Sequence, residues 1–406
     1  MTAPSAATPA GSGDQSAEAR AQFVVIVAWI VYILVAMACV WVLLTELRTV
    51  VGFRAFAYGV FFAALPVPVL VVGLALVDRR RPPPTQLVLV VLVWGSCIAT
   101  LLALKLNEFA VGHISPDLNR DLRGAIFVAP WVEEAAKASI LFAIAWWQRR
   151  RIVTPLGGAL YGAIAGVGFA FTENVVYYSG VFQETVMVKG DRSLALDAVR
   201  DLFWWRGVAA PFVHPVFTLV TGLGIGLALR QRNVGARILA PVAGYLGAVV
   251  LHTGYNTLAA YATDRQLSAV YVGILLPLLM AAIVVLALVR RHDRRVLAAR
   301  LDDYVVTGWL RPWQADAIAT GRGRRDVMRS AGQYGPFGRQ HARAWLSSGV
   351  DLGAIRDRIV RGVASDEDLD TERALLDVVR GVLPEHRAAA RPITQSADVA
   401  THIATS

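Results

Sequence analysis

Eight apolar runs, each close to 20 residues long, constrain this chain more than any other feature of its sequence. A run of that length crosses the hydrocarbon core of a bilayer as one α-helix. Because 56% of all residues are hydrophobic, the pattern predicts an all-α polytopic transmembrane helix bundle of about eight spans. The runs cover roughly residues 23–44, 55–77, 87–104, 124–147, 155–179, 207–229, 239–261 and 268–289.

Clusters of arginine mark alternate connections between these runs, whereas the other connections are longer and of mixed charge. The clusters lie within residues 79–81, 149–151, 230–237 and 290–295. Positively charged connections stay in the cytoplasm. The sequence therefore predicts a multi-pass protein of the cell membrane with both termini in the cytoplasm, and an even number of spans agrees.

The segments outside the runs differ in kind. Residues 1–22 are rich in Ala, Ser, Thr, Pro and Gly, which is typical of a disordered leader, and they lack the basic region of a signal peptide. Residues 23–290 form the predicted membrane domain. Residues 291–406 form a predicted helical cytoplasmic tail with a flexible end. Its short helices are expected near 339–350, 352–360 and 367–379, with Gly- and Pro-bearing breaks between them.

The formal net charge of +10 does not indicate a nucleic-acid partner. From residue 296 onward the chain has 15 Arg and 14 Asp plus Glu, so the tail is nearly neutral and the excess charge lies between spans. The tail has no zinc-ligand spacing, phosphate loop or DNA-reading helix, which favours an interaction or stability module. Cys39 and Cys97 both lie in apolar runs, so a disulfide framework is excluded.

Ionisable residues inside the predicted spans are few and clustered. Each costs roughly 3 kcal/mol at bilayer depth, so such groups are normally kept for a protein interior or a water-filled cavity. They occur only in the fourth to seventh runs. The six residues are Glu133, Glu134, Lys137, Glu173, His214 and His252.

Four of these residues are expected at one level of the membrane. At about 1.5 Å rise per residue, Glu133, Glu173, His214 and His252 lie ~14, ~9, ~11 and ~14 Å from the outer ends of their spans. Independent structural pairs would have no reason to share a depth. The sequence therefore predicts one convergent site in the outer half of the bilayer.

The chemistry of such a site follows from its side chains. Carboxylates and imidazoles that converge in a low-dielectric cavity can activate water, and two His with one Glu are the ligand set of a catalytic zinc site. Asn256 follows His252 by one helical turn and is placed to donate to an oxyanion or orient the imidazole. A single His or Asn on an apolar helix is more often structural, so the prediction depends on convergence.

Glycines in the fifth and sixth runs have the spacing that lets helices pack closely. They are Gly157, Gly158, Gly162, Gly166 and Gly168 in the fifth run, and Gly222, Gly224 and Gly226 in the sixth.

Four ordered stretches of this region resemble the motifs of the PrsW family of intramembrane proteases, within the wider superfamily of CAAX-type prenyl endopeptidases and bacteriocin-immunity proteases. Residues 129–137 match EExxK, and residues 161–174 match FxxxE with its following Asn. The third and fourth stretches are His214 with 221–224, and 251–256. The resemblance covers roughly residues 124–261, the predicted catalytic core.

The resemblance implies an intramembrane endopeptidase in which Glu133 and Glu134 are essential, one of them polarising the attacking water. It implies that Glu173, His214 and His252 bind a metal, zinc being the metal that this ligand set suits. Alternatively they serve as base and oxyanion partners, because related prenyl endopeptidases work without bound metal.

The implied substrate is a single-span membrane protein, such as an anti-sigma factor, that reaches the site through the lipid bilayer. Two alternatives remain open from the sequence. One is an ion- or proton-coupled transporter, whose groups would be strung along the membrane normal, and the other is a non-catalytic membrane scaffold.

Overall fold

The computed structural model of the protein describes residues 12–113, 120–147 and 154–381, and no β-strand occurs among them. The all-α fold is therefore as predicted. The chain forms two compact units. We call Met1–Val77, Pro83–Ala228 and Ile238–Leu286 the membrane unit, and Asp78–Pro82, Leu229–Arg237 and Ala287–Ser406 the tail unit.

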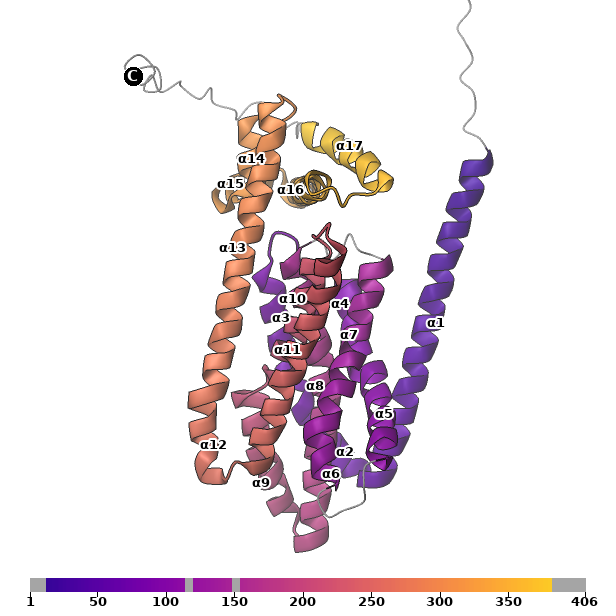
Figure 1. Ribbon diagram of the computed structural model, residues 1–406, viewed down its shortest axis with the longest axis vertical. Helices are drawn as coiled ribbons and strands as arrows, with labels where there is room; N and C mark the ends of the chain where they lie inside the picture. The colour runs from indigo at the N-terminus through magenta and orange to yellow at the C-terminus, as the bar shows by residue number, and fades with distance from the viewer. Residues whose placement is uncertain (1–11, 114–119, 148–153, 382–406) are drawn as a thin grey trace, which may run out of the picture. The chain divides into compact units, whose positions relative to one another are not determined.

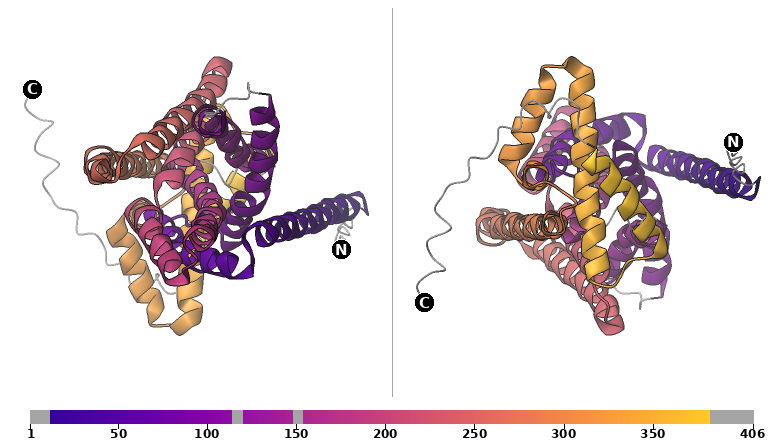
Figure 2. Two further views of the ribbon diagram at one scale, coloured as in Figure 1. Left: turned by 90° about the horizontal axis from the view of Figure 1, so that it is seen from below. Right: turned by 90° about the horizontal axis from the view of Figure 1, so that it is seen from above.

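Helices fill the N-terminal part of the membrane unit (Figure 1). Residues 12–22, predicted to belong to a disordered leader, are part of α1, and residues 1–11 lie outside the described residues. The N-terminal part of α1 leans away from the other helices of this unit (Figures 1 and 2). The elements are α1 (Ser12–Val51), α2 (Phe53–Ala64), α3 (Pro66–Val77), α4 (Thr85–Val93), the π-helix η1 (Trp94–Ala99), α5 (Thr100–Gly112) and α6 (Arg120–Arg123).

The remaining helices of the membrane unit carry the predicted site residues. Among them α8 is central, since 89% of its most apolar window is buried, against 6% for the span Phe53–Val77. The elements are η2 (Gly124–Val128), α7 (Ala129–Trp147), α8 (Pro155–Lys189), α9 (Arg192–Phe203), η3 (Trp204–Ala209), α10 (Val213–Ala228), α11 (Val234–Tyr261), α12 (Asp264–Val270), η4 (Tyr271–Leu275) and α13 (Leu276–Val306).

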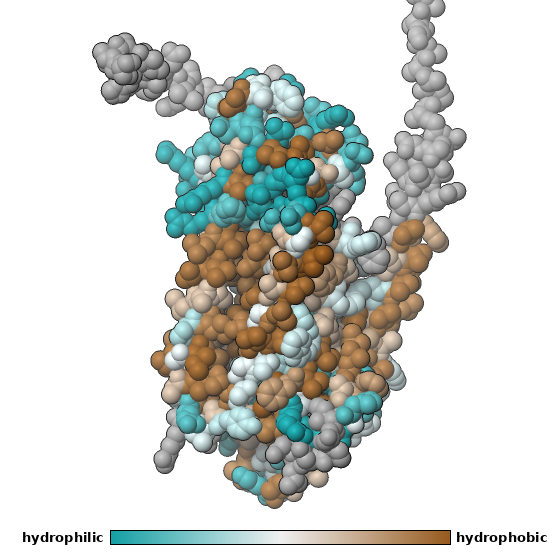
Figure 3. All heavy atoms as spheres, viewed as in Figure 1, coloured by the Kyte–Doolittle hydropathy of each residue, from teal (hydrophilic) through white to brown (hydrophobic). Residues whose placement is uncertain are grey.

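Seven helical segments of the described chain are long and apolar enough to cross a membrane, and together they make this a multi-pass membrane protein. The predicted span 124–147 is also helical, as η2 and α7. It is not among the seven, because Glu133, Glu134 and Lys137 make α7 less apolar than the others. Apolar side chains dominate the visible lateral surface of the membrane unit (Figure 3).

Close packing of α8 against α10 fixes the centre of the membrane unit. Successive glycines of α8 face backbone carbonyls of α10, so that a Cβ at Gly162 would lie 2.3 Å from the Thr218 oxygen and a Cβ at Gly166 would lie 2.5 Å from the His214 oxygen. Only glycine permits this approach. The predicted close-packing role is confirmed for the glycines that the sequence singled out in α8 and α10, other than Gly157. This packing brings Glu173 on α8 near His214 on α10.

The helix is interrupted just before α10, and this interruption places His214 in the first turn of α10. Pro215 has no N–H, and in a continuous helix its ring would clash with the carbonyl of residue 211, which is also a proline. The helical segment therefore ends with η3 at Ala209 and resumes at Val213.

The tail unit contains α14 (Pro312–Ala319), α15 (Gly321–Gly332), α16 (Gly335–Val360) and α17 (Asp366–Arg380). They enclose a core that includes Leu301, Ile318, Leu346, Leu352 and Val379, all almost completely buried. One expectation was wrong, because 339–350 and 352–360 are parts of a single helix, α16. Gly349 and Gly353 do not end the helix. The side chains of Ile318 and Leu297 occupy the space where a Cβ would stand at these two positions, so the glycines serve close packing.

Candidate active site

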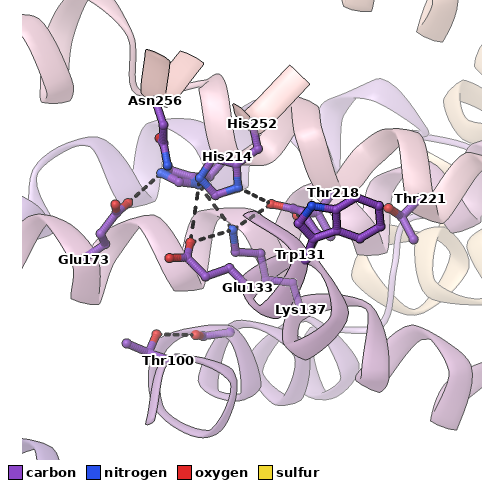
Figure 4. A network of polar contacts seen from close by, with 12 residues as sticks. Thr100, Trp131, Glu133, Lys137, Glu173, His214, Thr218, Thr221, His252 and Asn256 are labelled. Carbon is purple, nitrogen blue, oxygen red and sulfur yellow. Dashed lines mark hydrogen bonds and ion pairs between the residues drawn. The ribbon is translucent and has the colours of Figure 1, made fainter. Parts of the chain in front are cut away.

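The structure brings together all six ionisable residues that the sequence singled out, and all of them except Glu134 are labelled in Figure 4. They come from four helices and meet inside the membrane unit. Glu133, Glu134 and Lys137 lie on α7, Glu173 on α8, His214 on α10 and His252 on α11.

Glu134 is completely buried and fully hydrogen-bonded. Its Oε1 accepts from Lys137 Nζ at 2.8 Å and lies 3.0 Å from His252 Nδ1, and its Oε2 accepts from Thr218 Oγ1 at 3.0 Å. Because a carboxylate only accepts, it fixes His252 as the tautomer with the proton on Nδ1. Glu134 therefore orients His252 and leaves the Nε2 lone pair facing the other way.

Lys137 is the cation at the centre of this network and is also completely buried. Besides Glu134, its Nζ lies 3.6 Å from Glu133 Oε2 and 3.3 Å from His214 Nδ1. The ammonium also lies over the ring of Phe169, 3.8 Å from its centroid. Lys137 is therefore paired with both glutamates, and its shorter contact is to Glu134.

Glu133 is different, because its Oε2 is buried and has no hydrogen-bond partner among the described residues. This oxygen lies 3.7 Å from His252 Nε2. Glu133, His214 and His252 each offer a ligand atom, and these atoms all lie within 4.8 Å of one another. The three residues form the group best placed to hold a metal ion in the described chain.

Glu173 lies next to this group and contacts one of its members. Its Oε2 is 2.5 Å from His214 Nε2 and 3.0 Å from Arg206 Nη2. Neither the Glu173 oxygen nor the His214 nitrogen satisfies hydrogen-bond geometry, although both are shielded from solvent. The sequence predicted Glu173 in the ligand set. The structure places Glu173 against His214, whereas Glu133 offers a ligand atom within 4.8 Å of those of both imidazoles.

Arg206 was not predicted as a site residue. Its Nε donates to Asn174 Oδ1 at 2.7 Å, and its guanidinium lies 4.0 Å from the ring centroid of Tyr177. Together with the contact to Glu173, this fixes the side chain at three points. The sequence signal was an arginine beside the apolar run that carries His214, which the chosen span boundary at residue 207 left out.

Thr218 was also missed, although it lies one turn after His214 on the same face of α10 and is completely buried. Asn256 was predicted to act in the site. Its Nδ2 donates to the backbone oxygen of Ala125 at 2.8 Å, so its recorded contact joins α11 to η2. Its catalytic role stays a prediction.

The residues present fit a bound divalent metal. Two atoms of this group, Glu133 Oε2 and His214 Nε2, are buried without hydrogen-bond partners among the described residues, and unsatisfied buried polar atoms are rare unless an ion or water meets them. Two imidazoles and a carboxylate form a known donor set for a catalytic metal. In addition, three carboxylates face only two cationic side chains, so the site has room for added positive charge.

The fold and this site define a multi-pass α-helical membrane protein with a buried centre of carboxylates and imidazoles. A family model described as PrsW family intramembrane metalloprotease matches residues 83–288, a little over half of the 406 residues. The chain belongs to this family and is an intramembrane endopeptidase. No curated protein and no solved structure matches it.

Proposed function

We propose that this endopeptidase cleaves a peptide bond of a single-span membrane protein in the outer half of the bilayer, with zinc as its metal. The observation that carries the proposal is the group Glu133, His214 and His252, in which two buried ligand atoms lack hydrogen-bond partners among the described residues. An intramembrane peptidase must hold water and charged groups at a depth where the bilayer excludes both. The converging carboxylates and imidazoles provide a polar site of this kind.

The metal would be held by His214, His252 and Glu133. His252 is prepared for this role because Glu134 accepts its Nδ1 proton and directs Nε2 toward Glu133. Zinc supplies a Lewis acid that polarises the scissile carbonyl and activates water. Carboxylates behind ligating histidines fix the ring orientation and raise the basicity of the ligand.

Glu173 would then hold the proton taken from the attacking water, at Oε2. This oxygen lies beside His214 Nε2 and is held in place by Arg206. Arg206 is in turn fixed by Asn174 and Tyr177. A base positioned in this way contributes typically 10²–10⁴-fold to the rate.

The substrate class follows from the position of the site. Its groups lie among helices α7, α8, α10 and α11, so a peptide bond reaches them when a substrate helix moves in sideways from the lipid bilayer. We propose an anti-sigma-factor-like protein as the substrate class, on family resemblance. We also propose that the protein lies in the cell membrane with both termini in the cytoplasm, because arginine-rich connections favour the cytoplasmic side. Reporter fusions at residue 406 would test this orientation.

Cleavage of a co-expressed panel of tagged single-span membrane proteins tests the proposed function. We expect a fragment with the wild type and none with Glu133→Ala or His252→Ala at matched protein levels. Glu184→Gln, an exposed position on α8, and His113→Ala are the matched controls and should leave the fragment unchanged. A fragment that persists in both site variants, or its absence with the wild type, would favour a transporter or a scaffold.

Metal content distinguishes the roles of the two glutamates. If Glu133 is the ligand, Glu133→Gln loses bound zinc, whereas Glu173→Gln keeps zinc and loses activity. The reverse result would restore the arrangement predicted from the sequence, with Glu173 as ligand and Glu133 as base. Equal zinc content in Glu133→Gln, Glu173→Gln and His252→Ala would contradict a metal at this site.

A further inference from the structure

Four arginines of the tail unit form a cluster, and all of them except Arg290 interact with the charge of a single carboxylate, that of Asp78. The Oδ1 of Asp78 also accepts the backbone N–H of Arg80 at 3.3 Å. One follows α3, two lie on α13 directly after its apolar part, and one lies on α15. In that order they are Arg80, Arg290, Arg294 and Arg324.

Two of these side chains have donors without an acceptor. The Nε of Arg294 and the Nη1 of Arg324 are shielded from solvent and have no hydrogen-bond partner in the described part of the chain. A buried donor left unsatisfied costs about 1–3 kcal/mol, and more when it is charged. Each such group in a folded protein indicates a missing acceptor, such as water or an ion.

Repulsion between like charges adds to this cost. Burial, followed by the charges of Arg294 and Arg324, lowers the pKa of Arg80 to about 10. Burial also lowers the pKa of Arg324, against the opposing effect of Asp78. Both guanidinium groups stay protonated at neutral pH, so the repulsion persists in the folded protein.

Other buried arginines of the tail unit are neutralised by carboxylates. Arg230 pairs with Asp293 at 3.3 Å and with Asp357 at 3.0 Å, and Arg358 pairs with Asp368 at 3.0 Å. The cluster around Asp78 differs because three of its four arginines share one carboxylate. The excess positive charge of this cluster and its two donors without acceptors would both be satisfied by a bound anion.

We propose that this cluster binds a phosphate-bearing anion, either the headgroup of an anionic phospholipid or a free phosphate compound. Guanidinium groups bind phosphate oxygens through paired N–H donors, and the Nε of Arg294 and the Nη1 of Arg324 would donate to it. Arg80 comes directly after the apolar span Phe53–Val77. Basic pockets at such positions on the cytoplasmic side bind lipid headgroups.

Thermal unfolding of the full-length protein in nonionic detergent tests this site. One arm adds phosphatidylglycerol, with phosphatidylcholine as its control, and the other adds inorganic phosphate, with chloride at equal ionic strength. We expect Arg294→Gln and Arg324→Gln to weaken the anion response roughly tenfold or more. The exposed neighbours Arg295→Gln and Arg325→Gln remove the same charge and should respond as the wild type does.

The two arms identify the source of the anion. A response to phosphatidylglycerol alone assigns a lipid headgroup, and a response to inorganic phosphate assigns a soluble compound. Without either anion, Arg294→Gln and Arg324→Gln should unfold no earlier than the wild type, because they relieve repulsion, so a lost response is not misfolding. An identical response of the wild type, the cluster variants and the neighbour variants would overturn the proposal.

Discussion

Both units of this protein bury charged side chains, but they satisfy them differently. In the tail unit Asp357 accepts from Arg230, Arg300 and Arg361 at 2.8–3.2 Å, so its carboxylate is saturated. In the membrane unit Glu134 is saturated in the same way, whereas Glu133, one residue earlier, keeps a buried oxygen with no hydrogen-bond partner in the described part of the chain. Saturated charges hold a fold together, and unsatisfied ones indicate where a ligand or a reaction belongs.

The largest effect should separate the two adjacent glutamates. We expect Glu133→Gln and Glu134→Gln each to reduce peptide cleavage by roughly 10³-fold. Only Glu134→Gln should also destabilise the membrane unit, by about 3 kcal/mol, because it leaves Lys137 buried without its closest carboxylate. Thermal unfolding in detergent would measure this. Equal destabilisation by both variants would remove the distinction between a saturated and an unsatisfied carboxylate.

The next effect concerns Arg206, which positions Glu173. Arg206→Lys keeps the charge but cannot bond both Glu173 and Asn174 through a planar fork. We expect kcat to fall roughly 10- to 100-fold, as for other groups behind the reacting residues, with KM little changed. Arg192→Lys on α9 is the control, and a change in KM alone would assign Arg206 to substrate binding instead.

A smaller effect should come from the contact between α8 and α10. Gly166→Ala places a Cβ against the His214 carbonyl, which we expect to destabilise the protein by about 1–3 kcal/mol and to reduce cleavage by displacing His214. Gly180→Ala on the same helix meets nothing within 4 Å and should be neutral or slightly stabilising. If both variants behave alike, close packing does not position the site.

The smallest effect is a pH dependence of the tail unit. Burial alone would raise the pKa of Asp357, but the hydrogen bond from Arg361 and the charge of Arg230 outweigh it, so this pKa lies below its usual range. The stability that Asp357 contributes is therefore present above the ordinary carboxyl pKa and is lost as the pH falls through the folded-state value.

Asp357→Asn should cost about 1–2 kcal/mol near neutral pH, since solvent screens the partly exposed Arg300 and Arg361. It should also flatten the acid limb of a tail-unit unfolding curve followed by amide exchange. The exposed Asp326→Asn is the control. An unchanged acid limb in Asp357→Asn would show that this carboxylate is not saturated in solution.

The sequence by itself determined the class of this protein and singled out the ionisable residues that the structure brings together. Apolar runs of bilayer length are expected to form helices, because inside the membrane every backbone N–H and C=O must find a hydrogen-bond partner within the protein. The cost of charge in an apolar span made Glu133, Glu134, Lys137, Glu173 and His252 stand out without any structure.

Only the tertiary structure decided what each of these residues does. Glu133 and Glu134 are neighbours of identical chemistry, and the direction each side chain takes from α7 determines which one is saturated. Arg206 and Thr218 became visible as partners only when α8 and α10 packed together. The arginine cluster near Asp78 joins three segments that are far apart in the chain, so no local sequence pattern could have predicted it.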